Sequence, residues 1–213
     1  MKKAKLVLIG GGGHCKSCID VIEQQGQFEI VGILDVPQKQ GETILGYKII
    51  GSDDDCEKLH NAGCVFLITV GQIKTASVRK NIFEKLQSID AEIVSIVSPH
   101  AYISKYANIA KGTIVMHNVV VNAGSSVGQN CILNTGCTIE HDAKIGNHTH
   151  VSTGVFVNGD CNIGNEVFIG SNTTIINQIA VGNNVVIGAG SVIVKNINNN
   201  KIAIGNPTRE IEI

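Results

Sequence analysis

The triplet Glu140-His141-Asp142 is the group of residues in this sequence that is best suited to chemistry. An imidazole accepts a proton near neutral pH, and a neighbouring carboxylate raises its basicity by stabilising the imidazolium. Packing alone does not require two carboxylates around one histidine. We therefore predict a catalytic role for the triplet, with His141 as a base. The alternative interpretation is a polar corner exposed on the surface.

A glycine-rich loop with an acidic residue downstream is the second candidate. Gly10 and Gly12 follow an apolar run and precede a helical pattern, where backbone amides can bind phosphate groups. Cys15 stands where the dinucleotide fingerprint has its third glycine, which argues against NAD. Asp35, about twenty residues further on, is suited to bonding a ribose or a base. These residues predict a site for a nucleotide without nicotinamide, and the alternative is a tight turn without a ligand.

Cys15 and Cys18 form a CxxC motif inside the same segment. Such a motif can serve redox chemistry or supply half of a zinc site. The sequence contains no second CxxC, and the glycine run already explains the segment as a phosphate-type loop. We therefore expect neither role.

A six-residue repeat in the second half of the chain would position His141. From Ile103 to Ile193 an aliphatic residue recurs at every sixth position, sixteen times in succession. The fourth residue after each aliphatic is small or β-branched, and the first is often Gly or Asn, which accept positive φ at turns. This pattern predicts short strands and turns, three of which close one triangular coil. Cys131, Cys137 and Cys161 fall on the small inward position, so we expect them in the core.

Residues 1–100 have no such period and alternate between strand and helix patterns. We predict strands at 5–10, 28–35, 64–70 and 92–97, helices at 15–25 and 75–86, and a helix N-terminus at Ser52 and the three aspartates after it. The alternation predicts a small Rossmann-like parallel sheet of the α/β class. Ser98-Pro99 is the expected boundary, which gives domains at 1–100 and 101–213.

Composition limits the classes of function. The 213 residues have a formal charge of −1, which argues against nucleic-acid or acidic-membrane partners. No apolar run approaches the roughly 20 residues that span a bilayer, and no signal peptide is recognisable. The seven cysteines show no compact spacing. We therefore expect a cytoplasmic protein with free thiols.

The two halves together resemble the bacterial nucleotide-sugar acetyltransferases of the sialic-acid O-acetyltransferase-like group, which includes enzymes that N-acetylate UDP-4-amino-4,6-dideoxy sugars. The resemblance implies an all-β left-handed parallel β-helix in the second half and a homotrimer with each acetyl-CoA site between two β-helices. The residues that carry it are GGGGH at 10–14, Asp35, Val70-Gly71, the Glu140-His141-Asp142 triplet, His150 and the closing Gly205-Asn206-Pro207-Thr208-Arg209.

The resemblance also implies roles for individual residues. His141 would be the general base, Asp142 would raise its basicity, and Glu140 completes the catalytic triplet. Nucleotide-sugar contacts are implied at Gly12, Gly13, His14, Asp35 and Gly71, with Asn134 near the sugar. Acetyl-CoA contacts are implied at His150, Gly170, Ser171, Gly188 and Ala189. Val36 stands where some members have an acid, so base or sugar selectivity is expected to differ.

The predicted function is acetyl-CoA-dependent N-acetylation of the 4-amino group of a nucleotide-linked 4-amino-4,6-dideoxy sugar, without a metal, in the synthesis of bacterial surface glycans. O-acetylation of a sialic or related nonulosonic acid would need the same base and is the nearest alternative. A metal hydratase with histidine ligands is disfavoured because His117 and His141, 24 residues apart, cannot stack in one subunit. A nucleotide-binding scaffold and a solenoid without chemistry are the alternatives that are not enzymes.

Overall fold

The computed structural model describes residues 3–211, which form two compact units. One unit runs to Gly71 and includes Ser77–Pro99, and the other comprises Gln72–Ala76 and the chain from His100 onward. No helix within residues 3–211 is long and apolar enough to cross a membrane.

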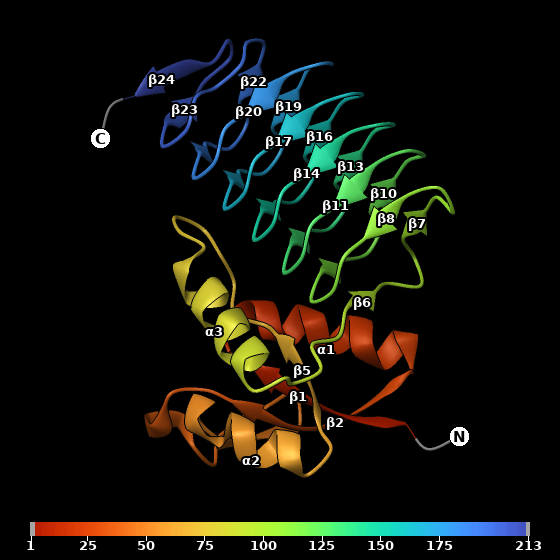
Figure 1. Cartoon of the computed structure of the whole chain (residues 1–213), viewed down its shortest axis with the longest axis vertical. Coiled ribbons are helices and arrows are strands. Elements are labelled where there is room, and N and C mark those ends of the chain that lie inside the picture. Colours follow the sequence, from red (N-terminus) through yellow and green to blue (C-terminus); the bar gives the residue numbers. More distant parts are fainter. Residues whose placement is uncertain (1–2, 212–213) are drawn as a thin grey trace. The chain divides into compact units, whose positions relative to one another are not determined.

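The N-terminal unit is built on a sheet with the strand order β3-β4-β2-β1-β5. β1 pairs in parallel with β2 and β5, β2 pairs in parallel with β4, and β3 forms an antiparallel hairpin with β4. The predicted α/β class with a parallel sheet is therefore confirmed (Figure 1). The elements are β1 (Ala4–Ile9), α1 (Gly13–Gln25), β2 (Phe28–Leu34), the 3₁₀ helix η1 (Pro37–Lys39), β3 (Thr43–Ile44), β4 (Tyr47–Gly51), the 3₁₀ helix η2 (Asp53–Asp55), α2 (Cys56–Asn61), β5 (Val65–Ile68), α3 (Ser77–Ser88) and β6 (Ile96–Val97).

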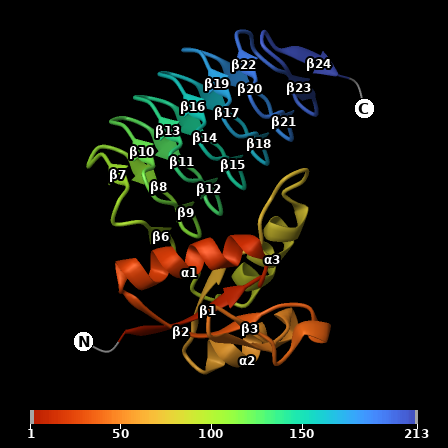
Figure 2. The same cartoon turned by 180° about the vertical axis from the view of Figure 1, so that it is seen from behind.

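Alternation along the strands places apolar side chains on both faces of this sheet. Val7 and Phe66 join Cys56 of α2 and Phe83 of α3 in one buried cluster. The intervening strand residues point to the opposite face, and Ile19 of α1 is fully buried. The views in Figures 1 and 2 show α1 and α2 on opposite sides of the strands. The sheet is therefore covered on both faces, as a parallel sheet requires.

Two local predictions in this unit have different outcomes. Ser52 and Asp55 form a reciprocal capping box at η2, which confirms the predicted helix start. The strand predicted at 92–97 is wrong over most of its length, because Ile93 makes only an isolated bridge with Phe66. The backbone N–H of Val94 still donates to the Phe66 carbonyl at 2.9 Å, but regular pairing then stops until β6.

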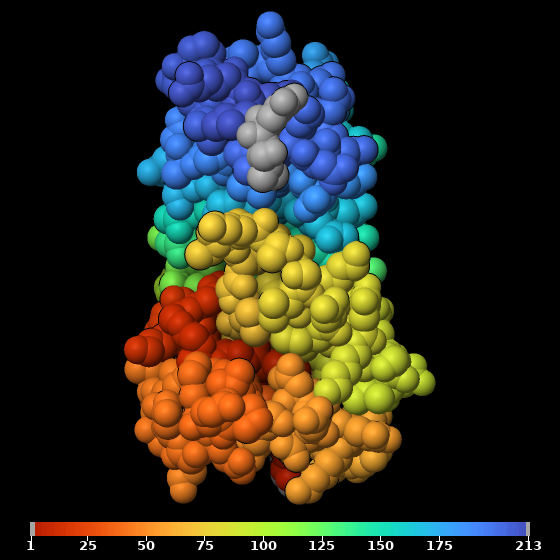
Figure 3. Space-filling model, turned by 90° about the vertical axis from the view of Figure 1, so that its left-hand side faces the viewer, coloured from red at the N-terminus to blue at the C-terminus, as the bar shows by residue number. Residues whose placement is uncertain are grey.

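The second unit is a parallel β-helix whose strands follow the predicted six-residue period. Each aliphatic of the repeat is the second residue of a two-residue strand, from Ile103 in β7 to Ile193 in β22. Strands 18 residues apart pair in parallel, as Val121 pairs with Ile139, so three strands make one coil. The expected left-handed parallel β-helix is confirmed. In the space-filling view of Figure 3, the colour of this unit changes steadily from green to blue, as expected for coils stacked in sequence order.

The strands form three faces. The first face contains β7 (Tyr102–Ile103), β10 (Val120–Val121), β13 (Thr138–Ile139), β16 (Phe156–Val157), β19 (Thr174–Ile175) and β22 (Val192–Ile193). The second contains β8 (Asn108–Ile109), β11 (Ser126–Val127), β14 (Lys144–Ile145), β17 (Asn162–Ile163) and β20 (Ala180–Val181). The third contains β9 (Ile114–Val115), β12 (Ile132–Leu133), β15 (His150–Val151), β18 (Phe168–Ile169), β21 (Val186–Ile187) and the closing hairpin of β23 (Ile202–Ile204) and β24 (Arg209–Ile211).

The prism interior is aliphatic, and the small inward positions are filled as predicted. Cys131, Cys137 and Cys161 are buried among the aliphatic residues and form no disulfide. The prediction that Gly and Asn directly after each aliphatic supply positive φ is wrong. Positive φ occurs instead at the third residue after the aliphatic, for example at Asn130 and Asp142. The glycines directly after the aliphatics serve close coil stacking instead, because a β-carbon at Gly146 would lie 2.5 Å from the backbone of the next coil.

Candidate active site

His141 and Asp142 lie at the corner that follows β13. His141 Nδ1 is 2.9 Å from Asp142 Oδ2, and both side chains are more than half exposed, at 61% and 64%. A carboxylate only accepts hydrogen bonds, so Nδ1 carries the proton and the neutral imidazole has its lone pair on Nε2. No residue between 3 and 211 forms a hydrogen bond with Nε2. The corner therefore presents an oriented imidazole with a bare basic nitrogen.

The electrostatics of this corner favour a stronger base. The hydrogen bond to Asp142 is the main cause that raises the pKa of His141 above its ordinary value. Desolvation lowers the pKa, but this hydrogen bond together with the negative charges of Asp142, Glu140 and Asp160 outweighs it. The predicted pairing of imidazole and following acid is thus present in the geometry.

Glu140 has a different position from its two neighbours. Its carboxylate accepts a hydrogen bond from Asn122 Nδ2 at 2.8 Å, in the preceding coil. It therefore acts on His141 through its charge rather than through a hydrogen bond. Sequence reasoning missed Asn122, and also Gly124, where a β-carbon would lie 2.3 Å from Asp142 Oδ1. The 18-residue spacing of the repeat is the signal that could have linked Asn122 to Glu140 and Gly124 to Asp142.

His150 contrasts with His141 because the fold uses both of its ring nitrogens. It is 8% exposed, and its Nδ1 lies 2.6 Å from the carbonyl oxygen of Gln72. A carbonyl accepts, so Nδ1 carries the proton and Nε2 accepts from Asn134 Nδ2 at 3.3 Å. The side-chain amide of Gln72 in turn donates from Nε2 to the backbone carbonyl of His148 at 3.1 Å. Sequence reasoning missed Gln72, since nothing in the sequence links it to a residue 78 positions away.

Four of the five residues predicted to contact acetyl-CoA lie on a different edge of the prism from His141, and the fifth, His150, lies in β15 on the third face. Asn134 directly follows β12, at the edge between the third and the first face. Gly170 and Ser171 follow β18, and Gly188 and Ala189 follow β21, on the same edge. His141 lies at the far end of β13, one six-residue side away, up to about 20 Å at roughly 3.3 Å per residue. Within one chain, His141 and these residues therefore lie at different corners of the prism.

In the N-terminal unit, the glycine loop lies at the carboxyl ends of β1, β2 and β5. The strand order reverses at β1, which is where open α/β sheets bind ligands. α1 begins after Gly12 with no side-chain cap and no acidic residue in its first turn, so no side chain competes there for an anion. A β-carbon at Gly12 or Gly13 would meet no atom within 4 Å. Gly71 lies beside His14, since its β-carbon would be 3.7 Å from that of His14.

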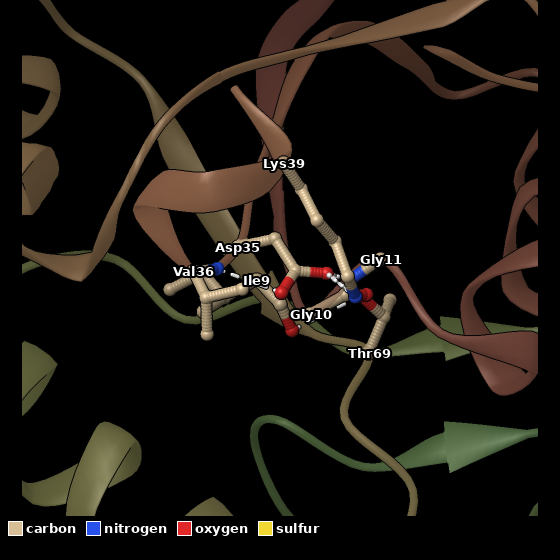
Figure 4. Close-up of polar contacts among 7 residues, drawn as sticks. All are labelled: Ile9, Gly10, Gly11, Asp35, Val36, Lys39 and Thr69. Carbon is tan, nitrogen blue, oxygen red and sulfur yellow. Dashed lines mark hydrogen bonds and ion pairs between the residues drawn. The ribbon is translucent and has the colours of Figure 1, made fainter. Parts of the chain in front are cut away.

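Asp35 closes one side of this loop. Figure 4 shows its carboxylate among the backbone of Gly11, the backbone of Val36 and the Lys39 ammonium. Desolvation opposes ionisation, but the N–H groups of Val36 and Gly11 and the Lys39 charge outweigh it, so the pKa of Asp35 lies below its usual range. Oδ2 accepts from Gly11 and Lys39, whereas Oδ1 accepts from Val36 and from no other residue between 3 and 211. Oδ1 therefore keeps capacity for one donor from a ligand.

A cavity of about 410 Å³ adjoins Asp35. Its size and its mixture of carboxylates, backbone and apolar side chains suit a nucleoside. Asp53 lines the same cavity, and burial is the main cause that raises its carboxyl pKa. The cavity is lined by Ile9, Gly10, Asp35, Val36, Pro37, Ser52, Asp53, Asp54, Val70, Val78 and Ile82.

The CxxC pair does not have the features of a redox or zinc site. Cys15 and Cys18 are buried in α1, and burial raises the pKa of both thiols above the usual range. Reactive cysteines need a lowered pKa and access to solvent. In residues 3–211, no cluster of three His, Cys, Asp or Glu side chains could hold a metal ion.

Comparison with known families agrees with this two-part architecture. Residues 5–86 match the model of the PglD N-terminal domain. Residues 88–158 match a GlmU-like C-terminal hexapeptide model, and residues 160–195 match the bacterial transferase hexapeptide model with six repeats. UDP-N-acetylbacillosamine N-acetyltransferase of Bacillus subtilis (strain 168) is 30% identical over 115 residues, which are 52% of this chain. The match thus spans about half the length of that relative, 50%.

Solved structures resemble the whole chain. The acetyltransferase domain of PglB from Neisseria gonorrhoeae FA1090, in complex with acetyl coenzyme A, is 30% identical, with a TM-score of 0.92 over 99% of this chain and 100% of that one. A histidine-to-asparagine variant of perosamine N-acetyltransferase from Caulobacter crescentus, in complex with CoA and GDP-perosamine, is 26% identical, with a TM-score of 0.93 over 99% and 98% of the two chains. The chain therefore belongs to the family of bacterial nucleotide-sugar acetyltransferases that join a PglD-type N-terminal domain to a hexapeptide-repeat β-helix.

Proposed function

We propose that this chain transfers the acetyl group of acetyl-CoA to the 4-amino group of a nucleotide-linked 4-amino-4,6-dideoxy sugar used in surface glycans. The observation that carries the proposal is the exposed His141, whose Nδ1 is held by Asp142 at 2.9 Å while Nε2 has no partner within residues 3–211. The Bacillus subtilis relative is named an N-acetyltransferase of an amino sugar linked to UDP. The Caulobacter crescentus neighbour is bound to CoA and GDP-perosamine.

His141 acts as the general base in the proposed reaction. Its Nε2 accepts a proton from the sugar amine as the amine nitrogen forms a bond with the thioester carbonyl carbon. The carbon–sulfur bond then breaks, and the imidazolium returns the proton to the departing CoA thiolate. Asp142 orients the imidazole and stabilises its protonated form, and Glu140 adds negative charge nearby. No covalent acyl-enzyme is needed.

The N-terminal unit, residues 1–100 in our domain assignment, is proposed to bind the nucleotide. Gly12, Gly13 and His14 at the start of α1 would face the pyrophosphate, because this helix N-terminus has no side-chain cap, a β-carbon at either glycine would meet no atom, and the helix dipole favours anions. Asp35 would accept a hydrogen bond from the base or ribose through Oδ1. Gly71 would border the same ligand.

The β-helix, residues 101–213, is proposed to bind acetyl-CoA along the edge that contains Gly170, Ser171, Gly188 and Ala189. Asn134 and its partner His150 lie at the start of that edge, where we place the sugar and the thioester end of the co-substrate. Because His141 lies one side of the prism away, we propose that the edge of a second copy completes each site. A homotrimer gives every His141 such a partner edge.

The reaction is tested by following free CoA while the protein is offered acetyl-CoA and one acceptor at a time. The acceptors are UDP- and GDP-linked 4-amino-4,6-dideoxy sugars and, separately, free and CMP-linked sialic acid. Thiol release with a 4-amino sugar, and an N-acetylated product by mass spectrometry, is the expected result. Release only with sialic acid would replace N-acetylation by O-acetylation, and no release with any acceptor would overturn the proposal.

A further inference from the structure

Gly159 occupies the position next to His141 in the following coil. It lies two residues after Val157 of β16, just as His141 lies two residues after Ile139 of β13. The register is fixed by the backbone, since the N–H of Asp160 donates to the carbonyl of His141 at 3.0 Å. Gly159 is buried although it lies at a corner. The side chain of His141 covers it.

The imidazole fills the space that a side chain at 159 would need. A β-carbon on Gly159 would lie 2.6 Å from Cε1 and 2.7 Å from Nε2 of His141. Asn177 Nδ2, one coil further, would be 3.2 Å from the same point. Real β-carbons essentially never come within 3.0 Å of another heavy atom, so the ring and a methyl group cannot both be there.

At Gly146 and Gly164 of the β-helix, a side chain is excluded by backbone and not by another side chain. At Gly146 and Gly164 a β-carbon would lie 2.5 Å and 2.6 Å from the backbone of the next coil. The three atoms nearest to a β-carbon at position 159 all belong to side chains, and the φ of Gly159 is not in the left-handed region. Neither coil stacking nor backbone conformation therefore requires glycine at 159. The imidazole of His141 is the group that requires it.

We propose that Gly159 is a positioning residue, which leaves room for the Nε2 edge of His141 while Asp142 holds the opposite nitrogen. The proposal rests on the proposed function, in which Nε2 is the basic atom. An alanine at 159 would be accommodated by rotation of an exposed side chain, so the fold survives. The rotated ring, however, loses its alignment with Asp142 and with the acceptor amine.

The test compares Gly159→Ala with Gly164→Ala as the matched control. Gly159→Ala is expected to keep its unfolding temperature and its KM for acetyl-CoA but to lose about 10²-fold in kcat, the typical effect of displacing a catalytic group by about 1 Å. Gly164→Ala is expected to lower the unfolding temperature, because its methyl group strikes backbone. In a His141→Ala background, Gly159→Ala is expected to cause no further loss of rate, since the ring through which it acts is absent.

A second measurement does not depend on turnover. The NMR titration of the His141 ring is expected to move to lower pH in Gly159→Ala, as the ring leaves Asp142, and to stay unchanged in Gly164→Ala. Wild-type kcat together with a wild-type His141 titration in Gly159→Ala would overturn the inference. If the wild type failed to release CoA with every acceptor tested, the proposed function would be wrong. The NMR titrations would still decide the role of Gly159.

Discussion

Two successive corners of one coil use polar side chains in opposite ways. At the corner after β14, Asn147 Oδ1 accepts from the backbone of Gln129, and Asn165 and Asn183 repeat this contact in later coils at 2.8 and 2.7 Å. At the corner after β13, no residue in the described range 3–211 bonds to His141 Nε2. The asparagines satisfy backbone donors, whereas His141 keeps a lone pair for a ligand. Chemistry in this fold is therefore expected where the hydrogen bonds of the coil leave a group unused.

The strongest test of this contrast removes the unused group. His141→Ala is expected to lower kcat about 10²–10⁴-fold, the usual contribution of a general base. The unfolding temperature should not change, because the side chain is 61% exposed and its one hydrogen bond within residues 3–211 is the one to Asp142. Steady-state kinetics and calorimetry on the same preparation measure both effects. A large loss of stability would show that the fold does need this imidazole.

A smaller effect is expected from the residue that orients the base. The base works when neutral, so kcat/KM falls as the pH drops through the raised pKa of His141. Asp142→Asn removes the negative charge and leaves at most a weaker, neutral hydrogen-bond acceptor, so the pKa of His141 should fall and the acidic limb of the pH profile should move to lower pH. The plateau rate should fall roughly 10–100-fold, as expected for loss of one charge-assisted hydrogen bond. An acidic limb that stays in place would assign it to another group.

Asp35 in the N-terminal unit is intermediate between His141, whose Nε2 is unused, and the corner asparagines, which bond to the backbone. Its carboxylate accepts from Gly11, Val36 and Lys39, and Oδ1 keeps capacity for one more donor. Asp35→Asn is expected to raise KM for the nucleotide sugar about tenfold, the scale of one hydrogen bond to a charged group. kcat at saturating sugar should stay at the wild-type value, since the change affects binding alone. Lys39→Met, which removes the exposed partner of the ion pair, is the control and should change KM far less.

The sequence predicted the strands of the β-helix because each aliphatic residue of the period has one place, inside the prism. It predicted the pair of His141 and Asp142 because adjacent residues at one corner stay together in any coil. Gln72 could not be found, since its contact with His150 depends on how a distant loop folds. Gly159 could not be found either, because glycine has no chemical group of its own and its role appears only when the imidazole is placed. The glycines directly after the aliphatic residues were wrongly predicted to have positive φ. They are glycine because a side chain would clash with the backbone of the next coil, and the sequence of a single repeat does not reveal such a clash.

The smallest effect is expected from the asparagine corners, where the side chains accept hydrogen bonds from the backbone of the preceding coil. Asn165 Oδ1 accepts from the Asn147 backbone at 2.8 Å, and the contact is exposed. Asn165→Ala should therefore lower the free energy of unfolding by about 1 kcal/mol, the net value of one such hydrogen bond, as measured by denaturant titration. The NMR titration of His141 should be identical to that of the wild type, because Asn165 is not among the groups that shift the pKa of His141. A shifted His141 titration would mean that the two corners are coupled along β14, and the division between structural and chemical corners would then be wrong.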